Sequence, residues 1–351
     1  RNGIMLVAHV RHLQRHEGVV EFAEAVRRGA LERLAPILMT ALAAGLATTA
    51  LASAQSSYTA VPGAFIVQDV TPDGSIVVGS GGGGGFYWAW TTDPSPTFIG
   101  GLSATGVSDD GSAICGNITD PMTGAEIAGR WTQATGWVSI GALPNAMQCP
   151  SLSSAYDISG DGETIVGLSW DGCDGRGFIW TLGVGMSQLE NLLNGTNRAT
   201  AIARDGSVVG GFAQSSTRTS VSWAPAGTGT VYDAASQGEV YNFTDDGDRM
   251  VGQWDGQGYY WDNPTPMGSP TLVPGAIPGW NGQATDANEA GDRVIGFDSF
   301  LLDSLGWVHD TSRPVPQQYQ RPRHGGHVDC LPVAVQNQRR PLKYFGYHGF
   351  T

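Results

Sequence analysis

Basic residues are scarce through the middle of this 351-residue sequence. Residues 55–310 contain seven arginines and no lysine against 27 aspartates and glutamates, and the whole chain has a formal net charge of −13. Nucleic acids and anionic membrane surfaces are bound through clustered lysine and arginine. The composition therefore argues against both as partners of this segment, and it favours a soluble domain outside the cell.

Signatures of catalysis are also missing from the sequence. His309 is the only histidine between residues 55 and 310, and no nucleophile elbow accompanies it. The chain contains no HExxH, GxxxxGK or CxxC motif, so zinc-protease, P-loop and thiol-redox chemistry have no sequence support. Carboxylates are plentiful, which leaves a glycosidase with two acidic residues open as an alternative.

Cysteines and metal-ligand patterns are few. Cys149 and Cys173 flank the third copy of a repeat described below, and in an exported domain they could form a disulfide. Cys115 occupies a strand position and is expected to be a buried thiol. Residues 170–174 and 254–256 place carboxylates in tight turns that calcium would accept, although turn chemistry explains them equally well. We therefore predict no cofactor and no metal site, with calcium as the alternative.

What the sequence does contain is a motif that recurs six times. Each copy has an apolar residue, a polar turn ending in glycine, and a β-branched run that ends in a second glycine. The clear turns are Asp73-Gly74, Asp110-Gly111, Asp161-Gly162, Asp205-Gly206 and Asp246-Gly247, followed by a sixth copy with Ala290-Gly291. The turn glycines are 37, 51, 44, 41 and 44 residues apart. Self-similarity at this period predicts a repeat architecture.

Each copy is typical of a hairpin followed by two more strands. The glycine supplies a positive φ, and the aspartate before it can bind its own backbone. The second glycine, exemplified by Gly79 and Gly210, allows another backbone to approach or begins a bulge. A third strand is expected to end in an aromatic residue, with Leu302 near that place in the sixth copy. The expected aromatic residues are Trp90, Trp131, Trp180, Trp223 and Trp261.

Four short strands in about 40 residues match one blade of a β-propeller. The fold class predicted for residues 55–310 is therefore all-β, a propeller-like domain of six visible four-stranded repeats. A β-helix or a sandwich is the alternative, and a seventh blade stays open. Because open sheet edges invite aggregation, we expect residues 58–61 to close the ring beside the last blade, near Leu301 or Trp307.

The motif resembles the HAF-type extracellular repeat, in which Ser-x-Asp-Gly-x-x-Val-Val-Gly precedes Ala-Phe-x-Trp. The best matches are residues 107–116, 158–180 and 202–210, and the resemblance extends over about residues 65–310. It implies a secreted bacterial propeller-like protein, and it carries no catalytic motif over to this sequence.

Residues 1–54 have a different character. The string from Arg33 to Thr40 resembles the heavy-metal branch of RND-type efflux transporters, over about residues 1–45. That resemblance implies the end of one membrane helix, a cytoplasmic connector and the start of the next helix. The same region also matches a secretory signal peptide, because Arg27, Arg28 and Arg33 precede an apolar run that ends in Ala52-Ser53-Ala54. We predict a join between the two kinds of sequence near residues 34–55, and cleavage after Ala54.

Residues 311–351 form a third segment. They contain five prolines and six basic residues with a single acid, Asp329, and no copy of the repeat. This composition predicts a disordered tail or a shifted reading frame beyond the true end of the protein. The function expected for the chain is an exported, non-catalytic propeller that binds or scaffolds an extracellular protein or glycan, and it reaches a membrane only through its N-terminal segment. A glycan hydrolase or lyase and a fragment of an efflux transporter are the alternatives.

Overall fold

The computed structural model describes residues 21, 23, 24, 26, 61–144, 151–170, 174–275, 279–300, 303–312 and 317–318. The chain divides into two units, residues 1–57 and residues 58–351. In the first unit, residues 23, 24 and 26 are helical. No helix in the described part of the chain is long and apolar enough to cross a membrane.

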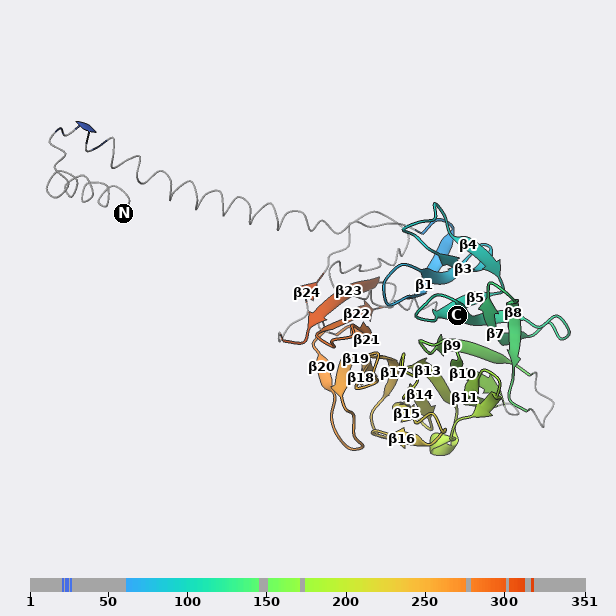
Figure 1. Ribbon diagram of the computed structural model, residues 1–351. Helices are drawn as coiled ribbons and strands as arrows, with labels where there is room; N and C mark the ends of the chain where they lie inside the picture. Colours follow the sequence, from blue (N-terminus) through green and yellow to red (C-terminus); the bar gives the residue numbers. More distant parts are fainter. Residues whose placement is uncertain are drawn as a thin grey trace. The chain divides into compact units, whose positions relative to one another are not determined.

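The second unit is a β-propeller of six four-stranded antiparallel sheets, which we call blades 1 to 6 (Figure 1). Blade 1 contains β1 (Ala64–Val70), β2 (Val77–Gly81), β3 (Gly84–Trp88) and β4 (Thr97–Gly100). Blade 2 contains β5 (Ser103–Val107), β6 (Ala113–Thr119), β7 (Glu126–Thr132) and β8 (Gly136–Gly141). Blade 3 contains β9 (Ser153–Ile158), β10 (Thr164–Trp170), β11 (Gly175–Thr181) and β12 (Gly185–Gln188).

The remaining blades follow a short 3₁₀ helix, η1 (Leu192–Asn194). Blade 4 contains β13 (Asn197–Ile202), β14 (Val209–Gln214), β15 (Arg218–Trp223) and β16 (Gly229–Val231). Blade 5 contains β17 (Gly238–Phe243), β18 (Arg249–Trp254), β19 (Gln257–Asp262) and β20 (Thr271–Val273). Blade 6 contains β21 (Asn281–Ala287), β22 (Arg293–Phe300), β23 (Asp303–Asp310) and β24 (Gln317–Gln318).

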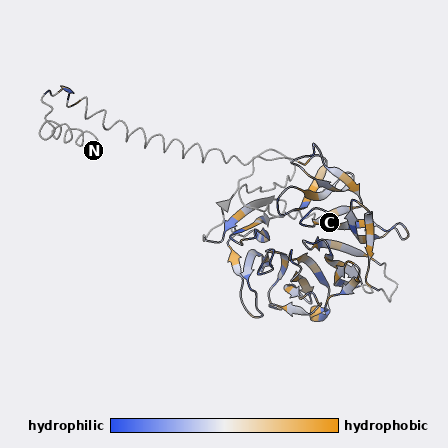
Figure 2. Cartoon of the chain, viewed as in Figure 1, coloured by the Kyte–Doolittle hydropathy of each residue, from blue (hydrophilic) through white to orange (hydrophobic). Residues whose placement is uncertain are grey.

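Hydrophobic side chains form clusters between neighbouring sheets rather than one central core. Figure 2 shows hydrophobic residues distributed over the strands of several blades. One cluster, for example, joins Cys115 and Ala128 of blade 2 to Ile158 and Phe178 of blade 3. Because a four-stranded sheet alternates its side chains between two faces, each blade can bury both faces only between two neighbours. This explains why the sequence repeats one pattern instead of assembling a single large core.

An inner-strand bulge explains the glycine that ends each second strand. In all six blades the pairing of the first two strands shifts by one residue, for example between Ala155 and Asp157 opposite Gly167 and Val166. A Cβ atom on Gly167 would overlap the carbonyl oxygen of Ser154, well inside 3.0 Å. The glycines in this position are Gly79, Gly116, Gly167, Gly211, Gly252 and Gly296. In blade 4 the residue is therefore Gly211, and the sequence-based choice of Gly210 was wrong by one position.

The aromatic residue predicted at the end of the third strand was wrong in the first and the last blade. In blade 1 the residue opposite Val77 is Trp88, whereas Trp90 follows the strand and is 45% exposed. In blade 6 the equivalent residue, opposite Val294, is His309 rather than a residue near Leu302. Trp307 and Val308 lie in the third strand of this blade.

The outer strand of blade 6 comes from beyond residue 310. Gln317 and Gln318 pair with Val308 and Trp307, so the sixth sheet takes β24 from the segment that the sequence assigned to the tail. Residue 58 and residues 301–302 lie outside the described residues, and so does the contact expected between the two ends of the ring. The proposed cleavage site after residue 54 lies outside them as well.

Candidate functional site

The Asp-Gly turns lie between the first and second strands of their blades, and all six turns share one geometry. Thr71 donates its backbone N–H to Ile76, and the φ angle of Gly74 is +74°. The carboxylate of Asp73 accepts hydrogen bonds from the Thr71 hydroxyl at 2.7 Å and from the Ser75 N–H at 2.9 Å. In the corresponding turns, φ at Gly111, Gly162, Gly206, Gly247 and Gly291 is +72°, +72°, +75°, +75° and +66°. We call the end of the propeller that carries these six turns the Asp-Gly face.

Hydrogen bonds favour the charged form of two turn carboxylates, Asp73 and Asp246. The Ser75 N–H and the hydroxyls of Thr71 and Ser75 lower the pKa of Asp73. The backbone N–H of Asp248 and the hydroxyl of Thr244 likewise lower the pKa of Asp246. In the sixth turn, where Ala290 replaces the aspartate, the Asn288 side chain accepts the Arg293 N–H instead, at 2.8 Å.

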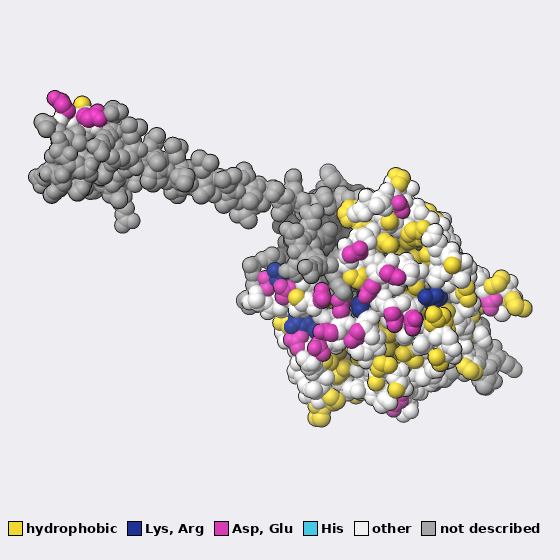
Figure 3. All heavy atoms as spheres, viewed as in Figure 1, with side chains coloured by type: hydrophobic (Ala, Val, Ile, Leu, Met, Phe, Trp, Pro, Cys, Tyr) yellow, Lys and Arg dark blue, Asp and Glu magenta, His cyan; other side chains and the backbone are white. Residues whose placement is uncertain are grey.

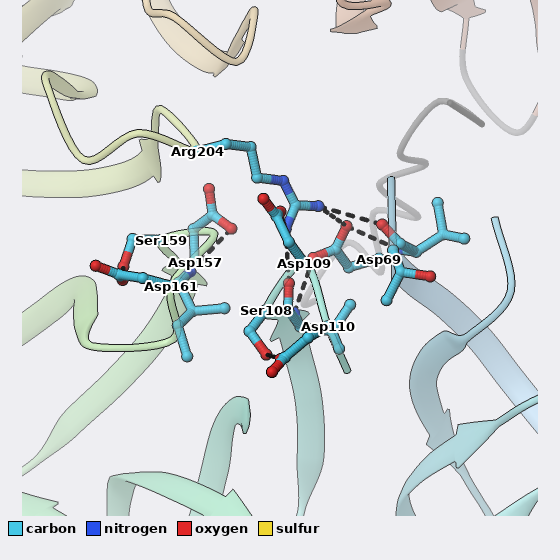
Figure 4. A network of polar contacts seen from close by, with 12 residues as sticks. Asp69, Ser108, Asp109, Asp110, Asp157, Ser159, Asp161 and Arg204 are labelled. Atoms are coloured by element: carbon cyan, nitrogen blue, oxygen red, sulfur yellow. Dashed lines mark hydrogen bonds and ion pairs between the residues drawn. The ribbon is translucent and has the colours of Figure 1, made fainter. Parts of the chain in front are cut away.

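Arg204 extends from the blade 4 turn across the axis and joins three blades (Figure 4). It donates to the carbonyl oxygen of Val107 at 2.6 Å and to that of Val70 at 3.2 Å. Its guanidinium also lies 3.3 Å from carboxylate oxygens of Asp69 and of Asp109. The side chain is only 12% exposed, so the arginine is a buried link between blade 4 and blades 1 and 2.

Aspartates on the bulged inner strands complete this axial network, which we define as Asp69, Asp109, Asp157, Arg204 and Asp286. Asp69 accepts the N–H of Val107 in the next blade at 2.9 Å, and Asp157 accepts that of Ile202 at 3.0 Å. Burial opposes the charge on Arg204, but the carboxylates of Asp69, Asp157, Asp109 and Asp286 outweigh it and raise the pKa of the guanidinium. The guanidinium therefore stays charged, and the polar atoms of the network bind neighbouring blades.

The turns themselves are linked from blade to blade by backbone hydrogen bonds. Asp109 donates its N–H to Gly160, Gly160 donates to Arg204, and Asp205 donates to Asp245, at 2.8, 2.7 and 3.1 Å. Four consecutive blades are thus connected near the axis without the use of side chains. This arrangement holds the blades together through backbone atoms.

Around this network the Asp-Gly face is acidic. Figure 3 shows carboxylates gathered on the face, with few basic side chains between them. Exposed acidic residues in or beside the turns are Asp73, Asp109, Asp110, Asp161, Glu163, Asp205, Asp246, Asp248, Asp262 and Glu289. The arginines nearby are engaged, since Arg249 pairs with Asp262, Arg293 lies 2.9 Å from Asp310, and Arg130 donates to Gly162 at 2.9 Å.

A second charged cluster lies at the opposite end of the inner strands. Glu239, which is 3% exposed, lies 2.5 Å from Arg198 and 3.6 Å from Arg218. The Arg198 guanidinium also lies over the ring of Tyr156, and both arginines lie over the ring of Phe212. One carboxylate shared by two arginines leaves this cluster with a local net positive charge.

His309 fills the aromatic position of blade 6 and is 3% exposed. Its Nδ1 atom has no hydrogen-bond partner among the described residues. Burial lowers the pKa of His309, and the neighbouring Arg249 lowers it further, whereas Asp310 acts in the opposite direction. The Tyr260 ring of blade 5 lies 5.9 Å away, so a proton on His309 would place a charge between two blades.

We expect this histidine to make stability depend on pH. Its pKa is lower in the folded state than the usual 6.5, so the unfolded chain binds the proton more readily, and stability falls as the pH drops below about 6.5. The variant His309→Phe should lose this part of the pH dependence. Urea unfolding at pH 7.5 and 5.5 measures it, and an unchanged difference between the two pH values in the variant would contradict the assignment.

Other predicted features have mixed outcomes. Cys149 and Cys173 lie outside the described residues, as do residues 171–173 of the first calcium candidate. The Asp255 carboxylate of the second candidate accepts the Gln237 N–H at 2.7 Å. Cys115 is buried, and its sulfur lies 3.3 Å from the Thr105 hydroxyl. The described residues contain no group of three or more histidine, cysteine, aspartate or glutamate side chains able to hold a metal ion.

Comparisons with known proteins point to two different parts of the chain. Residues 1–62 match the model of the AcrB/AcrD/AcrF family, which supports the resemblance of the first segment to an efflux transporter. This match covers less than a fifth of the sequence. No curated protein matches the chain.

Solved structures are similar to the propeller. A putative TolB from Agrobacterium tumefaciens is 14% identical with a TM-score of 0.44, over 72% of this chain and 80% of that one. TolB from Acinetobacter baumannii is 13% identical with a TM-score of 0.41, over 56% and 51%. A prolyl endopeptidase is 14% identical with a TM-score of 0.47, over 71% of this chain and 41% of that one. This chain thus spans about half of the second protein and less than half of the third.

Proposed function

We propose that the propeller is an exported, non-catalytic module that binds or scaffolds another protein through its Asp-Gly face. The observation that carries the proposal is the division of charge on this face. The axial carboxylates are engaged with Arg204 and with backbone N–H groups of neighbouring blades. The outer carboxylates, such as Glu163 and Asp248, are exposed and are free to meet a partner in solution.

The charge of the face favours a partner with a basic surface. Complementary potentials steer association and set its dependence on salt. A rigid ring that displays many short turns at one end also offers a broad contact surface, because loops held by a rigid scaffold commonly carry binding functions. Carboxylates can accept hydrogen bonds from the hydroxyls of an uncharged glycan, but such binding depends little on salt. The salt dependence of binding therefore separates the two kinds of partner.

The N-terminal segment supplies a second proposal. The match of residues 1–62 to the AcrB/AcrD/AcrF family supports an origin of this segment in an efflux transporter. The signal-like stretch that ends at Ala54 supports export of the residues that follow it. Both are consistent with a propeller that works in the periplasm or at the cell surface.

Charge reversal on the Asp-Gly face tests the proposed function. With fluorescent polylysine as the probe, the variant Glu163→Lys/Asp248→Lys should bind about tenfold or more weakly than the unaltered protein at low salt, since each reversal removes an attraction and adds a repulsion. The difference should shrink as salt is added.

The matched control makes the same change of charge at the opposite end of the strands. The variant Glu126→Lys/Asp174→Lys alters two exposed acids in or beside the second-to-third-strand loops of blades 2 and 3. It should keep most of the polylysine affinity. If both variants lose affinity equally, net charge rather than the Asp-Gly face is responsible, and the proposed contact surface is wrong.

A further inference from the structure

Five hydrophobic clusters join the six blades, and each lies between consecutive sheets. The second strand of each blade also packs on the first strand of the next, as β2 does on β5 and β18 on β21. No sixth cluster joins blade 6 to blade 1 among the residues that the structure describes. Figure 1 shows these two sheets farther apart than any two consecutive ones.

The face of blade 1 that points away from blade 2 is nevertheless apolar. Val78, Tyr87 and Ile99 pack toward blade 2, and since successive residues of a strand alternate between faces, Phe86 and Phe98 lie on the other side. Phe98 is 39% exposed, and its ring lies 5.9 Å from that of Phe86. No described cluster covers this face.

The face of blade 6 that points away from blade 5 is also apolar. Val294 and Trp307 pack toward blade 5, so Ile295 and Val308 lie on the opposite face. They are 5% and 7% exposed, and neither belongs to a cluster formed by the described blades. Two apolar sheet faces therefore border an interval that the six blades do not fill.

The last described strand of the chain belongs to blade 6, one of the two blades that border this interval. β24 pairs with β23 at the outer edge of blade 6 and ends at Gln318, and residues 319–351 follow it. We infer that residues 319–351 pack between blade 6 and blade 1 and cover both apolar faces. For residues 319–351 this proposal departs from the sequence-based expectation of a disordered tail; of the segment 311–351, the structure places Gln317 and Gln318 in a sheet.

The length, side chains and charge of the segment suit this place. The 33 residues from 319 to 351 fall just short of the shortest repeat spacing, 37. They include the apolar run 331–335 and aromatic residues at 344, 345, 347 and 350. They also carry five basic residues against the single acid Asp329, and the blades beside them expose Asp73 and Glu289.

Photo-crosslinking from blade 1 tests the inference on the full chain. With p-benzoylphenylalanine in place of Phe98, irradiation followed by mass spectrometry should give crosslinks to peptides from residues 319–351 of the same molecule. The same photoprobe in place of Met122, which is 92% exposed in the loop of blade 2, should give none. Crosslinks from position 98 to blade 6 itself or to a second copy, or none to residues 319–351, would overturn the proposal.

A protease assay gives an independent measurement. Packing against blade 1 should protect the peptide bonds after Arg323 and Lys343 from trypsin, because cleavage requires the segment to open first. The variant Phe98→Ser should raise their cleavage rate about tenfold or more, whereas Met122→Ser should not change it. Equal rates in the two variants and the unaltered chain would contradict the inference and support a tail that does not dock.

Discussion

Replacing Arg204 with methionine should lower the free energy of unfolding by about 3–5 kcal/mol, because removal of one partner from a buried charge network leaves the others uncompensated. Without the guanidinium, the carboxylate of Asp69 stays buried without its countercharge. The carbonyl oxygens of Val70 and Val107 each lose a donor. Methionine keeps much of the volume, so the loss reports charge and hydrogen bonding more than packing.

Two further variants separate the contributions. Arg204→Lys should recover only part of the stability, since an ammonium cannot reproduce the fork of donors that reaches two carbonyls and two carboxylates. Asp69→Asn combined with Arg204→Met should cost less than the sum of the two single changes, because the residues are in contact. Urea unfolding measures four variants: Arg204→Met, Arg204→Lys, Asp69→Asn and the double change. A loss of less than 1 kcal/mol for Arg204→Met would show that the axial network contributes little to stability.

The variant Gly167→Ala should destabilise the protein by about 3 kcal/mol, at the upper end of the cost of overpacking a core. The added methyl group would overlap the carbonyl oxygen of Ser154 and the ring of Phe178. The backbone oxygen belongs to β9, next to the inner-strand bulge, so relief requires the two strands to separate. The buried ring in turn packs against blade 2.

Gly82→Ala is the matched control for this glycine. Its φ angle is not in the left-handed region, and the nearest atom to an added Cβ, on Phe65, lies 3.9 Å away. We expect a change within about 0.5 kcal/mol for such a surface substitution. Thermal or urea unfolding of both variants is sufficient, and equal losses would show that the bulge does not account for the glycine.

The repeat could be predicted from the sequence because its local chemistry is self-contained. In a turn such as Asp110-Gly111, the Asp110 carboxylate accepts hydrogen bonds from the Ser108 hydroxyl and the Ser112 N–H. All partners lie within six residues, so the local sequence specifies the shape of the turn. Fold class followed from the number of such turns and their spacing. The same reasoning located the strands on either side of each turn.

Strand register could not be predicted as well. Trp90 and Trp88 are both plausible ends of a strand, and only the pairing of Val77 with Trp88 decides between them. Gly210 and Gly211 are equally acceptable to the motif, and the bulge in β13 selects the second. The fourth strand of blade 5, β20, lies beyond a loop that carries no copy of the motif, so no local signal predicts it.

The axial network was not predicted at all. Arg204 stands two residues before its turn glycine, where the other repeats have Pro72, Asp109, Gly160, Asp245 and Glu289. Two features of the sequence could have indicated the network. One is this single basic residue, and the other is the aspartate that lies five residues before the turn glycine in three repeats, at positions 69, 157 and 286. Its meaning depends on the ring, which brings Arg204 to an aspartate 135 residues away.

The long distance in sequence between Arg204 and Asp69 also affects how the chain folds. Hairpins within a blade are local in sequence and form early, whereas a contact spanning 135 residues has to overcome a large loop-closure entropy. During synthesis from the N-terminus, blades 1 to 3 emerge before Arg204 does, and Asp69 and Asp157 cannot reach their common cation. Docking of the blade 4 turn is then the event that brings blades 1, 2 and 4 together around the axis.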